Sequence, residues 1–124
     1  MRSELKNANR IVIKIGTSSI TYKNGKINFK KIEQLSKILT DLKNSGKEIV
    51  LVSSGAIGAG MSKLGLKSKP VELREKQAVA AVGQGLLMQF YEKFFNEYNQ
   101  TIAQLLLTED VMTDQIKRRN VENT

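Results

Sequence analysis

Short runs of valine, isoleucine and leucine limit the possible folds of this chain more than any other feature. Two of them, Arg10–Ile15 and Glu48–Ser53, each end at a stretch of glycine and serine. A short, continuous apolar run is typical of a strand that is buried on both faces, as in a parallel sheet. Residues 101–107 form a third run of the same kind. We therefore expect three buried strands of one parallel sheet.

Helical spacing separates these runs. From residue 28 to residue 46, apolar side chains recur every three or four positions. Asn28 is suited to cap the start of this helix, and Gly46 to close its end. The same spacing returns at 71–98 and again after Thr108. Strands that alternate with helices predict an α/β fold, in which a parallel sheet has helices on both faces.

Glycines modify this pattern at two places. Gly83 and Gly85 interrupt the helical spacing of residues 71–98, which predicts either a break in the helix or a close contact with another helix. The pair Asn24-Gly25 lies in the middle of residues 20–27. Because that pair favours a type I′ turn, we expect a small β-hairpin there.

Composition excludes several kinds of catalytic site. The 124 residues suit one domain, and they include neither cysteine nor histidine. Disulfides, thiolate or imidazole metal sites and histidine-activated nucleophiles are therefore excluded. Lysine, arginine, carboxylates, hydroxyls and backbone amides remain, a set that suits phosphoryl transfer. Since the start is polar and no run reaches about 18 apolar residues, we expect a cytoplasmic protein with no membrane partner.

Positive charge is concentrated in the first part of the chain. Residues 1–47 hold eleven basic and three acidic side chains, whereas residues 48–124 hold nine of each. The net charge of +8 therefore belongs to the first part. Such a segment fits a nucleic acid, a phosphorylated ligand, or a lysine-rich helix face that is simply solvated.

The first motif that can carry chemistry is Lys14, followed by Gly16, Thr17 and Ser18. A lysine in a buried strand is costly unless it is paired. Its place at the carboxyl end of the strand is where open α/β sheets bind ligands. Gly16 lets an anion approach the backbone closely, and the next two residues add hydroxyls. The alternative is a lysine on an edge strand whose side chain reaches water.

The second motif is the turn Ser54-Gly55-Ala56, where the second apolar run leads straight into a helix. The free amides and the positive end of a helix start favour an anion. The glycines at 55, 58 and 60 match neither the dinucleotide-binding pattern nor a Walker loop. The alternative is a plain turn whose glycines allow close packing. Because both motifs end parallel strands, we expect them to face one crevice.

The set of motifs resembles the amino acid kinase family. The resemblance rests on the lysine-glycine-threonine-serine start, on VSSGAIGAG at 52–60, on KQAVAAVGQG at 76–85 and on AQLLLTEDV at 103–111. It covers almost the whole chain from Arg10 on. The segment 52–60 is the most specific element, because other members usually carry three glycines in that turn. The chain is most similar to the members that phosphorylate L-glutamate.

This resemblance implies a parallel-sheet α/β sandwich and a kinase reaction. ATP would pass its γ-phosphoryl group to the side-chain carboxylate of L-glutamate, the first step of proline biosynthesis. Mg²⁺ would be held mainly by the phosphates of the nucleotide. Proline is implied as a feedback inhibitor and a homo-oligomer as the assembly, while neither a specific nucleic acid nor a membrane is implied as a partner.

The resemblance also implies a role for each residue of the two motifs. Lys14 would be the catalytic residue that neutralises the transferring phosphoryl group. The residues implied to bind the phosphates of ATP are Lys14, Gly16, Thr17 and Ser18. The residues implied to hold glutamate are Ser54, Gly55 and Ala56. No residue is implied to bind a metal.

The family domain is longer than this chain. We therefore expect residues 1–9 to be a polar N-terminal segment and residues 10–124 to be the substrate-side, N-terminal part of a kinase domain truncated at its C-terminal end. Such a part would lack groups that complete the site, so we expect it to be inactive alone. Two alternatives stay open: a sister kinase that acts on another carboxylate or phosphate, and a basic nucleic-acid-binding module.

Overall fold

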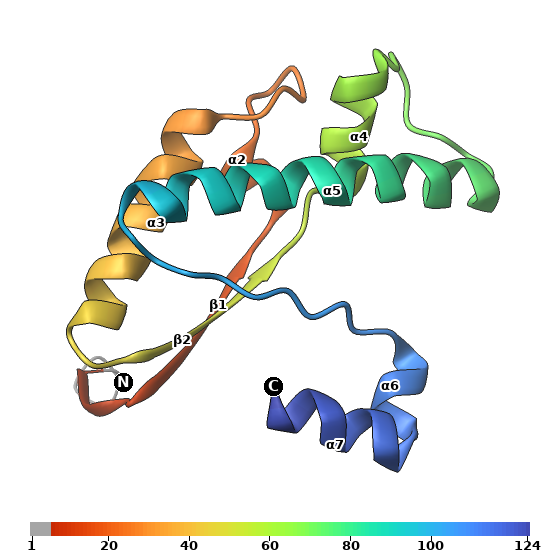
Figure 1. The fold of residues 1–124 in the computed structure, drawn as a ribbon. Coiled ribbons are helices and arrows are strands. Elements are labelled where there is room, and N and C mark those ends of the chain that lie inside the picture. The colour runs from red at the N-terminus through yellow and green to blue at the C-terminus, as the bar shows by residue number, and fades with distance from the viewer. Residues whose placement is uncertain (1–5) are drawn as a thin grey trace.

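A computed structural model describes residues 6–124 of the chain (Figure 1). Its strands and helices are β1 (Arg10–Ile15), α2 (Thr17–Ile20), α3 (Phe29–Asn44), β2 (Glu48–Ser53), α4 (Ala56–Leu64), α5 (Leu73–Glu97), α6 (Glu109–Thr113) and α7 (Gln115–Asn123). A parallel sheet joined by helices confirms the predicted α/β class. Of the segment 1–9 expected to be polar, residues 1–5 lie outside the described residues.

The sheet consists of β1 and β2 within the described part of the chain. The two strands pair in parallel, with Arg10 opposite Glu48 and Ile15 opposite Ser53, and both have the predicted bounds. Arg10 Nε donates a hydrogen bond of 2.6 Å to Glu48 Oε2 at the start of this pairing. Because the strands are parallel and in this register, the segments that follow Ile15 and Ser53 leave from the same edge of the sheet.

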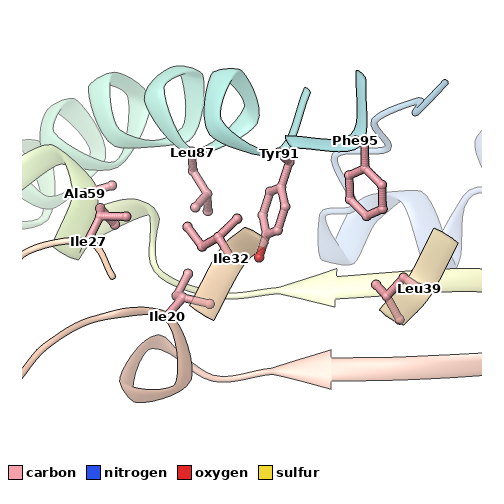
Figure 2. Close-up of a cluster of buried hydrophobic side chains, with 8 residues drawn as sticks. All are labelled: Ile20, Ile27, Ile32, Leu39, Ala59, Leu87, Tyr91 and Phe95. Atoms are coloured by element: carbon pink, nitrogen blue, oxygen red, sulfur yellow. The ribbon is translucent and has the colours of Figure 1, made fainter. Parts of the chain in front are cut away.

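The core lies between one face of the sheet and the helices α3 and α5. Its buried side chains are Ile20, Ile27, Ile32, Leu39, Ala59, Leu87, Tyr91 and Phe95. The strand residues packed against them are Ile13, Ile15, Ile49 and Leu51. Figure 2 shows Leu87, Tyr91 and Phe95 pointing from α5 toward the strands. The apolar stripe of α5 therefore covers the ends of the strands that lead to the two motifs.

Among residues 6–124 nothing buries the opposite face of the sheet, so the expectation of strands buried on both faces is wrong. Exposure alternates along both strands. Val12 is 63% exposed, Val50 45% and Val52 47%, and Lys14 lies on the same face. Successive side chains of a strand point to opposite faces, and α3 and α5 cover only one of these faces. The apolar runs therefore present one covered face and one bare apolar face.

Residues 101–107 form no strand, which contradicts the prediction of a third one. They run as an extended segment from α5 to α6 (Figure 1). Within residues 6–124, no backbone hydrogen bond joins them to β1 or β2. Leu105, Leu106 and Leu107 are 47%, 68% and 57% exposed. A strand needs a neighbour that pairs with its backbone, and an apolar composition does not by itself supply one.

Both predicted ends of α3 are confirmed. At the start, Asn28 Oδ1 accepts a hydrogen bond of 3.2 Å from Lys31 N. At the end, Gly46 has a φ of +93° and its N–H donates to the carbonyl oxygen of Lys43 at 3.0 Å. A left-handed glycine after the last turn is the usual way to satisfy the final carbonyls of a helix.

The hairpin after α2 is confirmed, but its turn is of another type. Thr21 and Ile27 form an antiparallel bridge. Gly25 N donates to Tyr22 O at 2.9 Å, and Gly25 has a φ of +81°, whereas the φ of Asn24 is negative. A type I′ turn needs a positive φ at both central residues, so the chain uses a turn followed by a left-handed glycine instead.

Helix α5 runs without a break through both of its glycines. Of the two alternatives for this helix, the close contact is therefore the correct one, and it occurs at Gly83. A Cβ at Gly83 would lie 1.6 Å from the carbonyl oxygen of Ala56, whereas a Cβ at Gly85 would meet nothing within 4 Å. The short helix α2 was not predicted, because Thr17–Ile20 is too short to show an apolar period.

The bare apolar face should make the 124-residue chain self-associate in solution. Val12 lies opposite Val50 in the register, so Val12→Lys combined with Val50→Glu adds two opposite charges and leaves the net charge unchanged. We expect this double variant to lower static light scattering several-fold, because water solvates the new charges. The far-UV circular dichroism spectrum should stay the same.

The matched control is Ile49→Lys, because Ile49 packs on the covered face of the sheet next to Val50. An unpaired charge placed against the core should abolish the cooperative unfolding transition. If the double variant scattered light as strongly as the unchanged chain, the bare face would not be the associating surface.

Candidate functional site

The two motifs lie side by side at the carboxyl edge of the sheet. Ser54 N donates to Ile15 O at 2.9 Å, which ties the second motif to the end of β1. The Thr17 side chain reaches the second motif from the first. A Cβ at Gly58 would lie 3.4 Å from Thr17 Cγ2, and a Cβ at Gly55 would lie 4.0 Å from Thr17 Oγ1. The parallel pairing of β1 and β2 thus brings together segments that are almost forty positions apart.

Gly55 makes the sharp turn from β2 into α4. Its φ of +114° and ψ of 2° are strained for any residue with a side chain. Space is also short, because a Cβ there would lie 3.1 Å from Ile20 Cδ1. Glycine at this position therefore lets the chain reverse direction against the buried end of α2.

The start of α4 leaves its amides free for a ligand. No side chain caps this helix, and its first turn contains no acidic residue. The first intrahelical bond runs from Ala59 N to Gly55 O at 2.9 Å, so the amides of residues 56–58 have no acceptor within the helix. Free N–H groups at the positive end of a helix form a site for a carboxylate or a phosphate.

Lys14 lies in solvent on the bare face of the sheet, next to Val52 in the register. The premise that it is buried is therefore wrong, since α3 and α5 cover the other face. Within the described residues, its ammonium group has no hydrogen-bond or ion-pair partner. The positive charge of Lys14 is thus not neutralised by a neighbouring carboxylate, and it is free to meet an anion at the edge of the sheet.

The turn after Lys14 is open to solvent. Gly16, Thr17 and Ser18 are all exposed, and a Cβ at Gly16 would meet nothing within 4 Å. Ser19 N donates to Gly16 O at 3.0 Å, which closes the first turn of α2. The backbone of this turn is therefore accessible to a phosphate group. The described residues form an open edge here, and the expectation that both motifs face one crevice stays a prediction.

Sequence reasoning missed Tyr91, which reaches the site from α5. Its hydroxyl oxygen lies 2.7 Å from Ser53 Oγ, directly before the second motif. Burial raises the pKa of Tyr91, and the hydrogen bond with Ser53 only partly offsets that effect. The hydroxyl is therefore protonated at neutral pH. Its spacing from Leu87 and Phe95 predicts a core position, and no local signal marks the hydroxyl as part of the site.

Neither motif contains an acidic residue. Within the described part of the chain, no group of three or more aspartate, glutamate, histidine or cysteine residues is placed to hold a metal ion. No helix there is long and apolar enough to span a lipid bilayer. The two motifs themselves supply the ammonium group of Lys14, hydroxyls and free amides.

Comparison with known proteins identifies similar sequences along the whole chain. A family model described as the amino acid kinase family matches residues 9–124. Over all 124 residues, the chain is 56% identical to proteins named glutamate 5-kinase from Clostridium perfringens, Listeria innocua and Enterococcus faecalis. These alignments cover 100% of this chain and 45–46% of each relative. The chain thus spans about half the length of the curated relatives it matches.

The turn at Gly55 gives a direct test of this local geometry. Gly55→Ala should lower the free energy of unfolding by about 1–2 kcal/mol, because alanine at a positive φ is strained. Urea denaturation of the 124-residue chain measures the change. Gly16→Ala is the matched control, because Gly16 has a φ of −80° and open space around it. An equal loss of stability in both variants would contradict the strained turn.

Proposed function

Because the chain belongs to the amino acid kinase family, we propose that it supplies the acceptor side of a glutamate 5-kinase. The proposed reaction is the ATP-dependent phosphorylation of the side-chain carboxylate of L-glutamate to L-glutamyl 5-phosphate, the first step of proline biosynthesis. One observation carries this proposal: the Lys14 turn and the uncapped start of α4 lie side by side at one edge of the sheet. The names of the relatives support the choice of glutamate.

The proposed reaction needs no proton transfer by the protein. The side-chain carboxyl group of free glutamate has a pKa near 4.3, so it is already a carboxylate at neutral pH. One of its oxygens attacks the γ-phosphorus, a new O–P bond forms, and the bond between that phosphorus and the β-γ bridging oxygen breaks as ADP leaves. A sequence without histidine suits this reaction, because the protein has only to position and stabilise charge.

We assign the transferring phosphoryl group to the Lys14 side. Lys14 is free of carboxylate partners among the described residues, so its charge can offset the negative charge that develops on the phosphoryl oxygens. Gly16, Thr17 and Ser18 would bind the phosphates through exposed backbone and hydroxyl groups. Mg²⁺ would neutralise phosphate charge, and we assign it to the nucleotide, since no described acidic cluster is placed to hold it.

We assign glutamate to the turn Ser54-Gly55-Ala56. The free amides at the start of α4 suit a carboxylate, and the absence of an acidic residue in that first turn avoids repulsion. The Thr17 side chain lies beside Gly55 and Gly58, so ligands bound at the two motifs would be neighbours. Proline inhibition, a homo-oligomeric assembly, a cytoplasmic location and the division at residue 10 stay predictions.

Acceptor specificity tests the proposal. A protein that carries this chain at the full length of its relatives should release ADP from ATP and Mg²⁺ when L-glutamate is present. L-Aspartate, N-acetyl-L-glutamate and nucleoside monophosphates should give no release above the background. Turnover with one of these other acceptors would favour a sister kinase.

A nucleic-acid-binding role is the second alternative, and salt dependence tests it. The lysines of α3 at 30, 31, 37 and 43 are exposed, which fits a solvated helix face. We expect only weak binding to random DNA that disappears near physiological salt. Tight binding that persisted there would favour the nucleic-acid module.

Lys14→Ala should reduce kcat far more than it changes the KM for glutamate. Loss of one charge aimed at the transition state costs on the order of 10²–10³-fold in kcat. Lys14→Arg should recover little, because a planar guanidinium group does not replace a compact ammonium group. Steady-state kinetics of the full-length protein measures both variants. A Lys14→Ala protein with near-normal kcat would exclude the assignment.

Ser54→Ala should raise the KM for glutamate more than the KM for ATP, since we assign this turn to the acceptor. Ser62→Ala is the matched control, because Ser62 is an exposed serine farther along α4. It should leave both KM values unchanged. A Ser54→Ala protein in which only the KM for ATP rises would show that the two motifs had been assigned the wrong way round.

A further inference from the structure

Helix α5 packs against the turn that we assign to glutamate. It follows this turn in the chain and packs most closely on α4, the helix that the turn begins. Figure 1 shows α5 running past the start of α4, and Figure 2 shows Tyr91 pointing from α5 toward β2. The backbone of the turn is thus supported by an element that contributes no residue to either motif.

Gly83 provides the first contact, at the helix side of the turn. A Cβ there would lie 1.6 Å from the carbonyl oxygen of Ala56 and 2.5 Å from the N of Gly60. Neither Gly83 nor Gly60 has a positive φ. A side chain is therefore excluded at these positions by the nearby backbone of the other helix, and not by backbone conformation. The two helices therefore touch backbone to backbone at the residue whose amide begins α4.

Gly60 makes the reciprocal contact from α4. A Cβ at Gly60 would lie 2.0 Å from the carbonyl oxygen of Val79. Two such contacts one turn apart on each helix hold the crossing in one place, since neither helix can slide without a backbone clash. The position of the first residues of α4 therefore depends on α5 as well as on β2.

Tyr91 provides a contact at the strand side of the turn. Ser53 Oγ donates to the carbonyl oxygen of Ser54 at 3.1 Å and lies 2.7 Å from the hydroxyl oxygen of Tyr91. A serine hydroxyl has one hydrogen, so Tyr91 is the donor when Ser53 donates to Ser54. Tyr91 is 3% exposed and Ser53 is half-buried, so this bond is partly shielded from water. A chain of two hydrogen bonds thus runs from α5 to the backbone of the turn.

We propose that Gly83 and Tyr91 are positioning residues for glutamate, because together they hold the backbone of residues 53–56 from its helix side and its strand side. The inference rests on the proposed function, since it takes glutamate as the ligand of this turn. Neither residue touches the substrate. Their effect is to fix the peptide that carries the Ser54 carbonyl, so that the free N–H groups at the start of α4, beginning with Ala56, stay in the orientation that binds a carboxylate.

Two alanine variants on the same helix test Gly83. In the full-length protein, Gly83→Ala should raise the KM for glutamate by at least about tenfold, because small misplacements of binding groups are costly. The KM for ATP should change less than about twofold on the same argument, since α2, which follows Lys14, packs mainly on α3. Gly85→Ala is the matched control: it has open space, so both KM values should stay the same while the thermal midpoint rises by a few degrees.

Tyr91→Phe keeps the test decisive if Gly83→Ala does not fold. It removes one hydroxyl from a ring that stays buried, and it should raise the KM for glutamate about three- to tenfold, the range expected for one lost hydrogen bond. Ser53→Ala should have a similar effect. The double variant should be no worse than either single one, because all three break the same chain of hydrogen bonds. Tyr98→Phe, at the residue directly after the end of α5, is the control and should change nothing.

Two readouts separate failure of this inference from failure of the proposed function. If the full-length protein phosphorylates glutamate and the folded variants keep the parental KM for glutamate, or lose affinity for both substrates equally, the positioning role is overturned. If the full-length protein does not use glutamate, the proposed function fails, and amide hydrogen exchange decides whether α5 holds the turn. Exchange at the hydrogen-bonded amides of Ser54 and Ala59 should then be faster in Tyr91→Phe than in Tyr98→Phe. Equal rates would overturn the claim that α5 holds the turn.

Discussion

The backbone contact between α4 and α5 is the constraint on which the rest of the site depends. At Gly60 and Gly83 no side chain separates the two helices, and a Cβ on either would overlap the backbone of the other. Contacts at this distance leave no room for adjustment, because protein interiors are packed as densely as crystals. The start of α4 is therefore packed directly against the backbone of α5. That position presents its free amides at the edge of the sheet beside the Lys14 turn.

The electrostatic character of this edge comes from what the chain leaves unpaired. The start of α4 has no capping side chain and no acidic residue in its first turn. Lys14 has no carboxylate partner among the residues that the structure describes. Both features are tolerated in the absence of a ligand because they face water, where an exposed charge or amide is solvated at little cost. The same exposure makes them available to a carboxylate and a phosphate.

The bare face of the sheet and the leucines of residues 101–107 share one physical origin. Each belongs to a run that is apolar at nearly every position, as strands covered on both sides usually are. In the described residues, α3 and α5 cover one face only, so Val12 and Val50 meet solvent. The extended segment likewise lacks a paired neighbour. The composition of these runs suits strands that are paired and covered on both faces, whereas residues 6–124 cover one face of the sheet and leave residues 101–107 unpaired.

The sequence by itself determined the features that depend on residues a few positions apart. Local spacing predicts the bounds of β1 and β2 and the two turns that follow these strands. It also predicts the caps of α3 at Asn28 and Gly46. Only the tertiary structure decided which face of the sheet is covered and that Gly83, but not Gly85, meets another helix. It also decided that Tyr91 reaches Ser53. These features depend on partners more than twenty residues away, and the periodicity of one segment carries no information about the surface of the segment that packs on it.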